Sequence, residues 1–131
     1  MLTISSSIFD QMVGYCRAGL PNEVCGMLAG SDSNVSKLYT MTNTEPSPVS
    51  YFMEPSEQFK AIKDIRNNGL SMLAIFHSHP ASEAFPSAKD VSLAFYDDAV
   101  YVIVSLLREA PAVKAFSIKD GKVKEIELDI R

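Results

Sequence analysis

Residues 72–90 read MLAIFHSHPASEAFPSAKD. The apolar run Met72–Phe76 predicts a short central strand, and it leads directly into His77 and His79, the only two histidines of the chain. Side chains along a strand alternate between its two faces, so both imidazoles should point to the same side. Two ring nitrogens on one side can converge on a single metal ion. Pro80 then ends the strand, which puts the pair at its carboxyl end.

A third candidate ligand follows in the same stretch. Asp90 lies eleven residues after His79, in the first turn of a helix that we expect over Ser87–Tyr96. Two imidazoles and one carboxylate leave one tetrahedral position for water, which is typical of a catalytic zinc site and not of a closed structural one. Ser87-x-x-Asp90 also matches a helix capping box with Asp in place of Glu. The two interpretations are compatible, because a cap fixes the direction of the Asp90 side chain.

Strands and helices interleave along the rest of the chain. The spacing of apolar residues predicts a helix that begins after Ser5, Ser6 or Ser7 and ends at Gly19, and another between Pro55 and Gly69. The first should bury Ile8, Phe9, Met12, Val13 and Cys16, and the second Phe59, Ile62 and Ile65. Further strands are expected at 2–4, Val24–Ala29, 35–41, Val100–Leu107 and Ala112–Lys119, and Thr44–Ser50 is expected to be a loop.

The end of the chain predicts a hairpin. Asp120-Gly121 is a favoured two-residue turn, and it should lead into a last strand that ends at Ile130, with a bulge between Val123 and Ile126. Strands interleaved with helices and closed by a hairpin indicate an α/β fold with a mixed β-sheet covered by helices. At 131 residues the chain has the size of one domain, residues 1–131.

Composition excludes several classes of function. The chain is 47% hydrophobic and 21% charged, as in an ordinary globular protein. Its net charge is −4, and its acidic and basic residues are interspersed without a basic stripe, so nucleic-acid binding is not expected. Apolar runs are only strand length, and the N-terminus lacks a signal-peptide pattern, so neither a membrane span nor export is expected. Two cysteines without a CxxC motif favour a reduced, cytoplasmic location. The oligomeric state stays open.

The order of these motifs resembles the JAMM (MPN+) metallopeptidase family. That family's pattern is a Glu on an early strand, then H-[ST]-H-P, about six residues, and S-x-x-D. Here Glu23 is followed by His77-Ser78-His79-Pro80 and, after six residues, by Ser87-x-x-Asp90. The segment LPNEVCGMLAG around Glu23 is similar to the family's Glu segment, and YVIVSL and AVKAFSI are similar to its late strands. The helical H-E-x-x-H zinc motif and the P-C-x-x-C motif of base deaminases are absent.

The resemblance implies a role for each matched residue. His77, His79 and Asp90 would bind Zn²⁺. Glu23 would be the general base that takes a proton from the attacking water and passes it to the leaving amine. Ser87 would donate a hydrogen bond to the oxyanion. The residues alone favour a different interpretation of Glu23, as an exposed loop acid. The implied fold is an α/β/α sandwich with helices on both faces of a mixed sheet, similar to cytidine deaminases.

The resemblance also narrows the substrate. Loops that bind ubiquitin in eukaryotic members correspond to Thr44–Tyr51 and Arg108–Ala112, and both are short here, as in compact bacterial and archaeal members. Those members resemble (iso)peptidases acting at the C-terminal tail of small ubiquitin-like or sulfur-carrier proteins, which is the leading hypothesis. The alternatives are a zinc amidase or dipeptidase on small peptides, and a non-catalytic module that binds a partner's tail. Cys25 is expected to be a small buried residue and not a ligand or redox group. Gly26 is expected to allow close backbone approach to the site.

Overall fold

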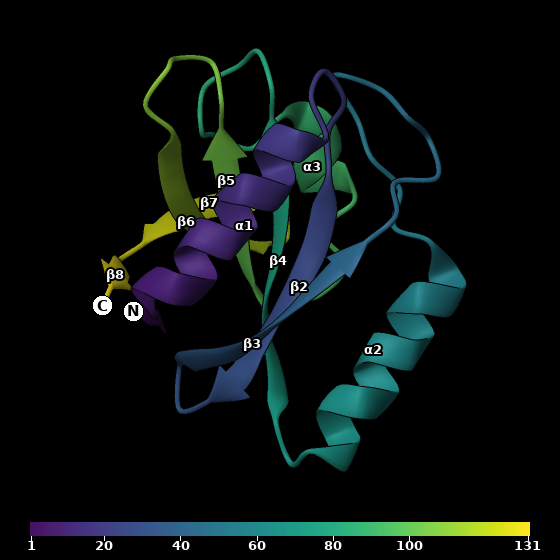
Figure 1. The fold of residues 1–131 in the computed structure, drawn as a ribbon, viewed down its shortest axis with the longest axis vertical. Helices are drawn as coiled ribbons and strands as arrows, with labels where there is room; N and C mark the ends of the chain where they lie inside the picture. The colour runs from purple at the N-terminus through teal and green to yellow at the C-terminus, as the bar shows by residue number, and fades with distance from the viewer.

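An eight-stranded mixed sheet organises the chain, in the order β7-β6-β5-β4-β2-β3-β1-β8 (Figure 1). The computed structural model describes all residues, 1–131. The strands are β1 (Leu2–Ile4), β2 (Cys25–Ser31), β3 (Asn34–Met41), β4 (Ser71–His79), β5 (Val100–Ser105), β6 (Ala112–Lys119), β7 (Lys122–Ile126) and β8 (Leu128–Ile130). The helices are α1 (Ser6–Ala18), α2 (Pro55–Asn67) and α3 (Ala88–Ser92).

Strand β4 is central, as its apolar sequence predicts. It pairs antiparallel with β2 on one side and parallel with β5 on the other. The strand is longer than the predicted run, because it continues through both histidines to His79 and stops before Pro80. A parallel pair needs a crossover connection, and here the crossover from β4 to β5 contains α3. The carboxyl end of β4 therefore lies where the chain must turn toward α3.

Helices cover both faces of the sheet, which confirms the expected layered fold. Helix α1 packs on one face through Met12, Val13 and Cys16. Ser5 caps its N-terminus, since the Ser5 side chain accepts a hydrogen bond from the Ile8 amide. Helix α2 packs on the opposite face, together with Ile75 of β4. Because His77 continues the alternation from Ile75, the two histidines point to the α2 face.

The predicted buried face of α2 is partly wrong. Its buried residues are Ala61 and Ile65, whereas the Phe59 side chain is 72% exposed. Each helical residue turns by about 100°, so Phe59 lies on nearly the opposite side of the helix from Ala61. The helical spacing places Phe59 on one face with Ile62 and Ile65, but Ala61 is the residue that packs into the core together with Ile65.

The third helix is shorter than predicted. It covers only Ala88–Ser92 and ends at Leu93, so the expected helix over Ser87–Tyr96 is wrong in its second half. The apolar residues that suggested a longer helix are not buried on one face, since Leu93 and Phe95 are exposed. The Tyr96 amide donates instead to the Tyr101 hydroxyl, which ties this segment to β5.

The end of the chain also differs from the prediction. Asp120 and Gly121 both have positive φ, as the two-residue hairpin requires. However, β7 pairs with β6 in regular register as far as Ile126, so the expected bulge is absent. The chain then leaves that edge at Glu127, and β8 pairs in parallel with β1 at the other edge of the sheet. Since a single residue separates the two edge strands, the sheet curls around α1.

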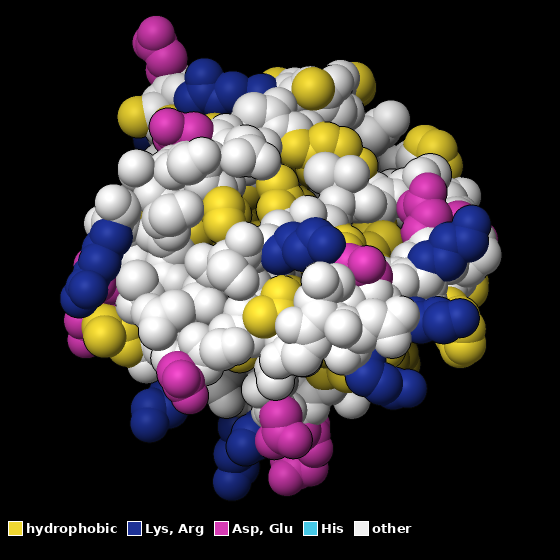
Figure 2. Space-filling view, turned by 60° about the horizontal axis from the view of Figure 1, so that its bottom comes forward, with side chains coloured by type: hydrophobic (Ala, Val, Ile, Leu, Met, Phe, Trp, Pro, Cys, Tyr) yellow, Lys and Arg dark blue, Asp and Glu magenta, His cyan; other side chains and the backbone are white.

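Surface charge agrees with the composition. Lys, Arg, Asp and Glu side chains are interspersed on the face shown in Figure 2, and no continuous basic stripe crosses it. Some charged side chains of the protein are paired, as in Lys37 with Asp64 and Arg108 with Glu83. None of the helices combines the length and apolar character that crossing a membrane requires.

Two glycines provide a matched test of this packing. A Cβ at Gly26 on β2 would collide with the Phe76 ring and the Tyr39 carbonyl oxygen, so the close approach at Gly26 is to the sheet core and not to the histidine site. Gly14, exposed in the middle of α1, has no such neighbour. We expect Gly26→Ala to destabilise the fold by about 1–3 kcal/mol. Gly14→Ala should stabilise it by about 0.5–1 kcal/mol. Denaturant unfolding measures both, and a neutral Gly26→Ala would contradict the packing described.

Candidate metal centre

Three potential ligand atoms converge at the carboxyl end of β4. His77 Nε2 lies 3.1 Å from His79 Nε2 and 3.2 Å from Asp90 Oδ2, and His79 Nε2 lies 3.0 Å from the same oxygen. A tetrahedral zinc ion with ligands at roughly 2.0–2.1 Å places neighbouring ligand atoms about 3.3 Å apart. The observed triangle is close to that geometry. The two histidines are only 1% and 3% exposed, so the ligand atoms are shielded from bulk water.

The chemistry of this donor set fits a cation. The Nδ1 atom of His79 lies 2.8 Å from the Glu83 carbonyl oxygen, which can only accept, so the imidazole donates there. A neutral imidazole that donates from Nδ1 presents a lone pair at Nε2. That lone pair faces the Asp90 carboxylate and the second imidazole at short range. Such a cluster of lone pairs is repulsive unless a metal ion or protons lie between them.

Burial and hydrogen bonds set the protonation of the three residues. Burial raises the pKa of Asp90, but its short contacts with both imidazoles and the hydrogen bond from the Ser87 amide outweigh burial, so the net pKa lies well below its ordinary value. Burial lowers the pKa of His77 and favours the neutral imidazole that binds metals. Burial also acts to lower the pKa of His79, yet the hydrogen bonds to Asp90 and to the Glu83 carbonyl raise it overall.

The capping box and the ligand role coincide at Asp90. The Ser87 hydroxyl oxygen accepts from the Asp90 amide at 3.0 Å, and the Ser87 amide donates to Asp90 Oδ2 at 2.9 Å, so the predicted box is present. The same Oδ2 atom faces both imidazoles. The capping box therefore holds the Asp90 carboxylate next to the two imidazoles. The Ser87 side chain is exposed, and its hydroxyl proton has no acceptor within the protein.

Glu23 lies beside this cluster and is buried. Its side chain is 4% exposed, so its interpretation as a solvent-exposed loop acid is wrong. Burial raises the pKa of Glu23 to about 7, with the nearby His79 imidazole opposing the shift. One carboxylate oxygen, Oε1, is buried without any hydrogen-bond partner. A buried carboxyl with a free oxygen and a pKa near neutrality is suited to accept and release a proton.

Backbone pairing places Glu23 next to the histidines. The Val24 amide donates to the Ser78 hydroxyl oxygen at 2.9 Å, and the Ser78 amide donates to the Val24 carbonyl oxygen at 3.0 Å. Ser78 stands between the two histidines and is fully buried. This reciprocal pair fixes the residue after Glu23 to the strand that carries the ligands.

Sequence reasoning missed the residue that contacts His77. The Tyr51 ring stacks on the imidazole with centroids 4.7 Å apart and planes 29° apart. The Nδ1 atom of His77 is buried without a hydrogen-bond partner, so the stack takes the place of the hydrogen bond that orients His79. Nothing near Tyr51 in the sequence signals this contact, because the two residues belong to separate segments.

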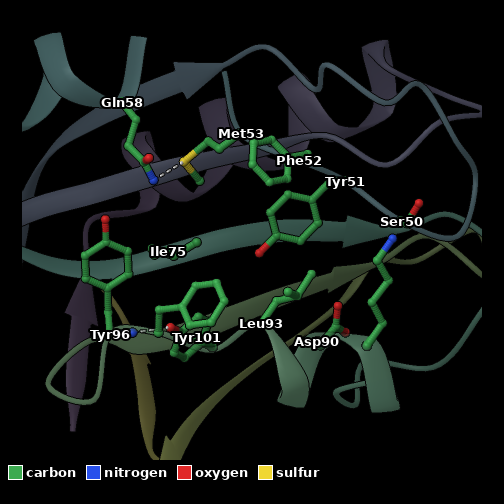
Figure 3. A pocket seen from close by; sticks show the side chains of 12 residues that line it. Ser50, Tyr51, Phe52, Met53, Gln58, Ile75, Asp90, Leu93, Tyr96 and Tyr101 are labelled. Atoms are coloured by element: carbon green, nitrogen blue, oxygen red, sulfur yellow. Dashed lines mark hydrogen bonds between the residues drawn. The ribbon is translucent and has the colours of Figure 1, made fainter. Parts of the chain in front are cut away.

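A pocket of about 200 Å³ adjoins the metal centre on the side of Asp90 (Figure 3). Tyr51 points into it from the loop before α2, and Leu93 and Asp90 line the opposite wall at α3. Most of its lining is hydrophobic. Cys25 does not belong to the metal-binding group, and burial raises the pKa of its thiol to about 12, which favours a neutral buried side chain.

Comparison with known proteins agrees with this geometry. Residues 5–119 match the family model described as prokaryotic homologues of the JAB domain. The chain is 35% identical to a CysO-cysteine peptidase from Mycobacterium tuberculosis, with 99% of this chain and 91% of that protein covered. It is 33% identical to a desampylase from Pyrococcus furiosus, with 81% and 74% covered.

A solution structure of a protein from Desulfitobacterium hafniense has the same fold as this chain. The two superpose with a TM-score of 0.90 at 40% sequence identity, covering 100% of this chain and 93% of that one. The resemblance to JAMM proteins, drawn from the order of Glu23, the H-S-H-P segment and Ser87-x-x-Asp90, is thereby confirmed. This chain belongs to the family of prokaryotic JAB-domain homologues, the prokaryotic branch of the JAMM proteins.

Proposed function

We propose that this protein is a zinc-dependent (iso)peptidase that hydrolyses an amide bond at the C-terminal tail of a small ubiquitin-like or sulfur-carrier protein. One observation carries the proposal: a buried carboxyl, Glu23, with an unpartnered oxygen lies beside a triangle of His77, His79 and Asp90 atoms. The names of the relatives, a peptidase of CysO-cysteine and a desampylase, support the substrate class. Residues 1–131 would form one catalytic domain, and two buried unpaired cysteines favour a cytoplasmic location.

The metal would be held by His77, His79 and Asp90, with one position left for water. When bound, zinc supplies a Lewis acid that polarises a carbonyl and lowers the pKa of water. The Glu83 carbonyl keeps His79 in the tautomer that offers Nε2. Tyr51 keeps the ring of His77 in place by stacking.

The protein's own groups would move the proton and stabilise charge. Glu23 would take a proton from the attacking water and deliver it to the leaving amine, because its raised pKa lets it do both near neutral pH. The Ser87 hydroxyl, whose proton has no acceptor within the protein, would donate a hydrogen bond to the oxyanion that forms at the carbonyl. Burial of the ligands keeps bulk water away from these charges.

The depth of the site favours a slender substrate. Both ligand histidines are buried, so the scissile carbonyl must reach into a recess. Glycines before that bond would let the backbone enter without steric conflict. The loops Thr44–Tyr51 and Arg108–Ala112 are short, which leaves little surface to hold a large globular partner.

Metal content is the first prediction. Protein purified without chelator should contain about one equivalent of zinc, and His77→Ala with His79→Ala should lose it, because one carboxylate alone binds zinc weakly. Elemental analysis measures the content. As a matched control, Asn68→Ala at the end of α2 should keep its zinc. Undiminished zinc in the double histidine variant would rule out this site.

Glu23→Gln tests the proposed base. The variant should keep its fold and zinc while hydrolysis falls by roughly 10²–10⁴-fold, the range expected when a general base is lost. Steady-state kinetics and elemental analysis on the same sample check both parts. Near-full activity would show that Glu23 is not the base.

The same variant has a pH signature in metal-free protein. Burial raises the folded-state pKa of Glu23 to about 7. The stability that the neutral carboxyl gives the fold is therefore fully present below the ordinary pKa of 4.5 and is lost as the pH rises through 7. Gln cannot ionise, so Glu23→Gln should be more stable than the wild type above pH 7. The difference should vanish below about pH 4.5. A difference in unfolding free energy that is constant with pH would contradict the burial of an ionisable group here.

Substrate selection gives a further prediction. A sulfur-carrier protein extended beyond its Gly-Gly end should be cleaved just after Gly-Gly, and the same carrier with Val-Val should be cleaved much more slowly, because each branched side chain obstructs entry. Mass spectrometry of the products measures both. Equal rates on both carriers and on a free short peptide would indicate a general amidase or dipeptidase. Binding without any cleavage would indicate a non-catalytic tail-binding module.

A further inference from the structure

The Asn43 side chain lies at the base of the loop between β3 and α2, and all of its hydrogen-bonding capacity is used. Its Nδ2 group donates to the carbonyl oxygens of Glu23 at 3.0 Å and Ser50 at 3.2 Å. Its Oδ1 atom accepts from the amides of Glu45 and Phe52, both at 3.0 Å. A primary amide has two donors and two acceptor lone pairs, so this side chain is fully satisfied.

The same loop holds both main-chain groups of Glu23. The Glu23 amide donates to the Ser47 carbonyl oxygen at 2.8 Å, and the Glu23 carbonyl accepts from Asn43. Ser78 fixes the next residue, Val24. The main chain around Glu23 is therefore held on one side by β4, through Ser78, and on the other by the loop between β3 and α2. Asn43 is the side chain through which that loop holds the Glu23 carbonyl.

Loop closure strengthens this arrangement. Asn43 and Met53 form an isolated antiparallel bridge that joins the two ends of the loop. Within the loop, Tyr51 stacks on His77. The Asn43 amide thus lies between the segment that contacts a metal-ligand candidate and the segment that carries Glu23.

We propose that Asn43 is a positioning residue: by holding the Glu23 carbonyl against the loop, its amide directs the Glu23 carboxyl toward the metal centre. The inference rests on the proposed function, because it takes Glu23 to be the base. Asn43 itself touches no ligand atom. Its effect on the reaction should therefore pass through Glu23.

A double-mutant cycle tests this dependence. Asn43→Ala is measured alone and together with Glu23→Gln, on the extended carrier, with zinc content determined for each protein. Alone, Asn43→Ala should lower kcat by about 10- to 100-fold with little change in KM and zinc, since a misplaced base loses rate and not binding. In the Glu23→Gln background it should cause no further loss, because the group it positions is already absent.

A structural readout and a matched control accompany the kinetics. Amide hydrogen exchange at Glu45 and Phe52 should accelerate in Asn43→Ala, because both amides donate to the Asn43 Oδ1 atom that the substitution removes. Asn68→Ala removes a similar bond, from an asparagine amide to the Asp64 carbonyl oxygen at 2.7 Å, at the C-terminal end of α2. It should leave kcat and amide exchange at Glu45 and Phe52 unchanged. If Asn43→Ala does not fold, Asn43→Ser carries the same cycle, since its shorter side chain cannot reach the Glu23 carbonyl.

The outcomes separate the inference from the function on which it rests. An equal loss of kcat from Asn43→Ala in both backgrounds would overturn the positioning role alone, and so would wild-type kcat in Asn43→Ala. Full activity of Glu23→Gln would contradict the proposed base and the positioning role together.

Discussion

A single carboxylate oxygen, Asp90 Oδ2, joins the N-terminus of α3 to the end of the central strand. It accepts from the Ser87 amide at 2.9 Å and lies 3.2 Å and 3.0 Å from the two imidazoles. Because the capping box holds the side chain in one orientation, the ligand triangle is set by the helix start and not by a flexible loop. The fold thus brings together three atoms that repel one another unless a metal ion or protons lie between them. The other contacts around the site keep these atoms together.

The remaining groups attach to this centre through the main chain. Ser78, between the two histidines, binds both main-chain groups of Val24 and so keeps Glu23 beside the ligands. The loop before α2 approaches from the other side, with Tyr51 on His77. Rigid sheet contacts therefore position the candidate ligands, while a loop completes the surroundings of Glu23, the proposed base. A fold of this kind can change its substrate by altering that loop without disturbing the metal centre.

Local patterns in the sequence predicted the parts of the structure whose partners are close in sequence. The alternation along β4 predicted the shared face of His77 and His79, and Ser87-x-x-Asp90 predicted the cap. The burial of Glu23 could not be predicted locally, because it depends on pairing between Val24 and Ser78, which are 54 residues apart. For the same reason Tyr51 and Asn43 gave no signal. Only the family pattern identified Glu23.

The predictions that were wrong have a common physical origin, because tertiary packing overrode the local structural preference of the sequence. Leu93 and Phe95 resembled a helix face but remain exposed after α3 ends. The last predicted strand divides at Glu127, because β8 pairs with β1 at the opposite edge. Neither the early end of α3 nor the pairing of β8 with β1 can be predicted from a short segment of sequence.

We propose that two imidazoles and a carboxylate, with no thiolate, bind one metal ion. Zinc K-edge X-ray absorption on the purified protein tests it most directly. We expect a first shell of four nitrogen or oxygen atoms at roughly 2.0–2.1 Å, with outer-shell scattering from two imidazoles. A sulfur ligand at about 2.3 Å would contradict it, because it would assign the metal to a cysteine such as Cys25 and not to the triangle of His77, His79 and Asp90.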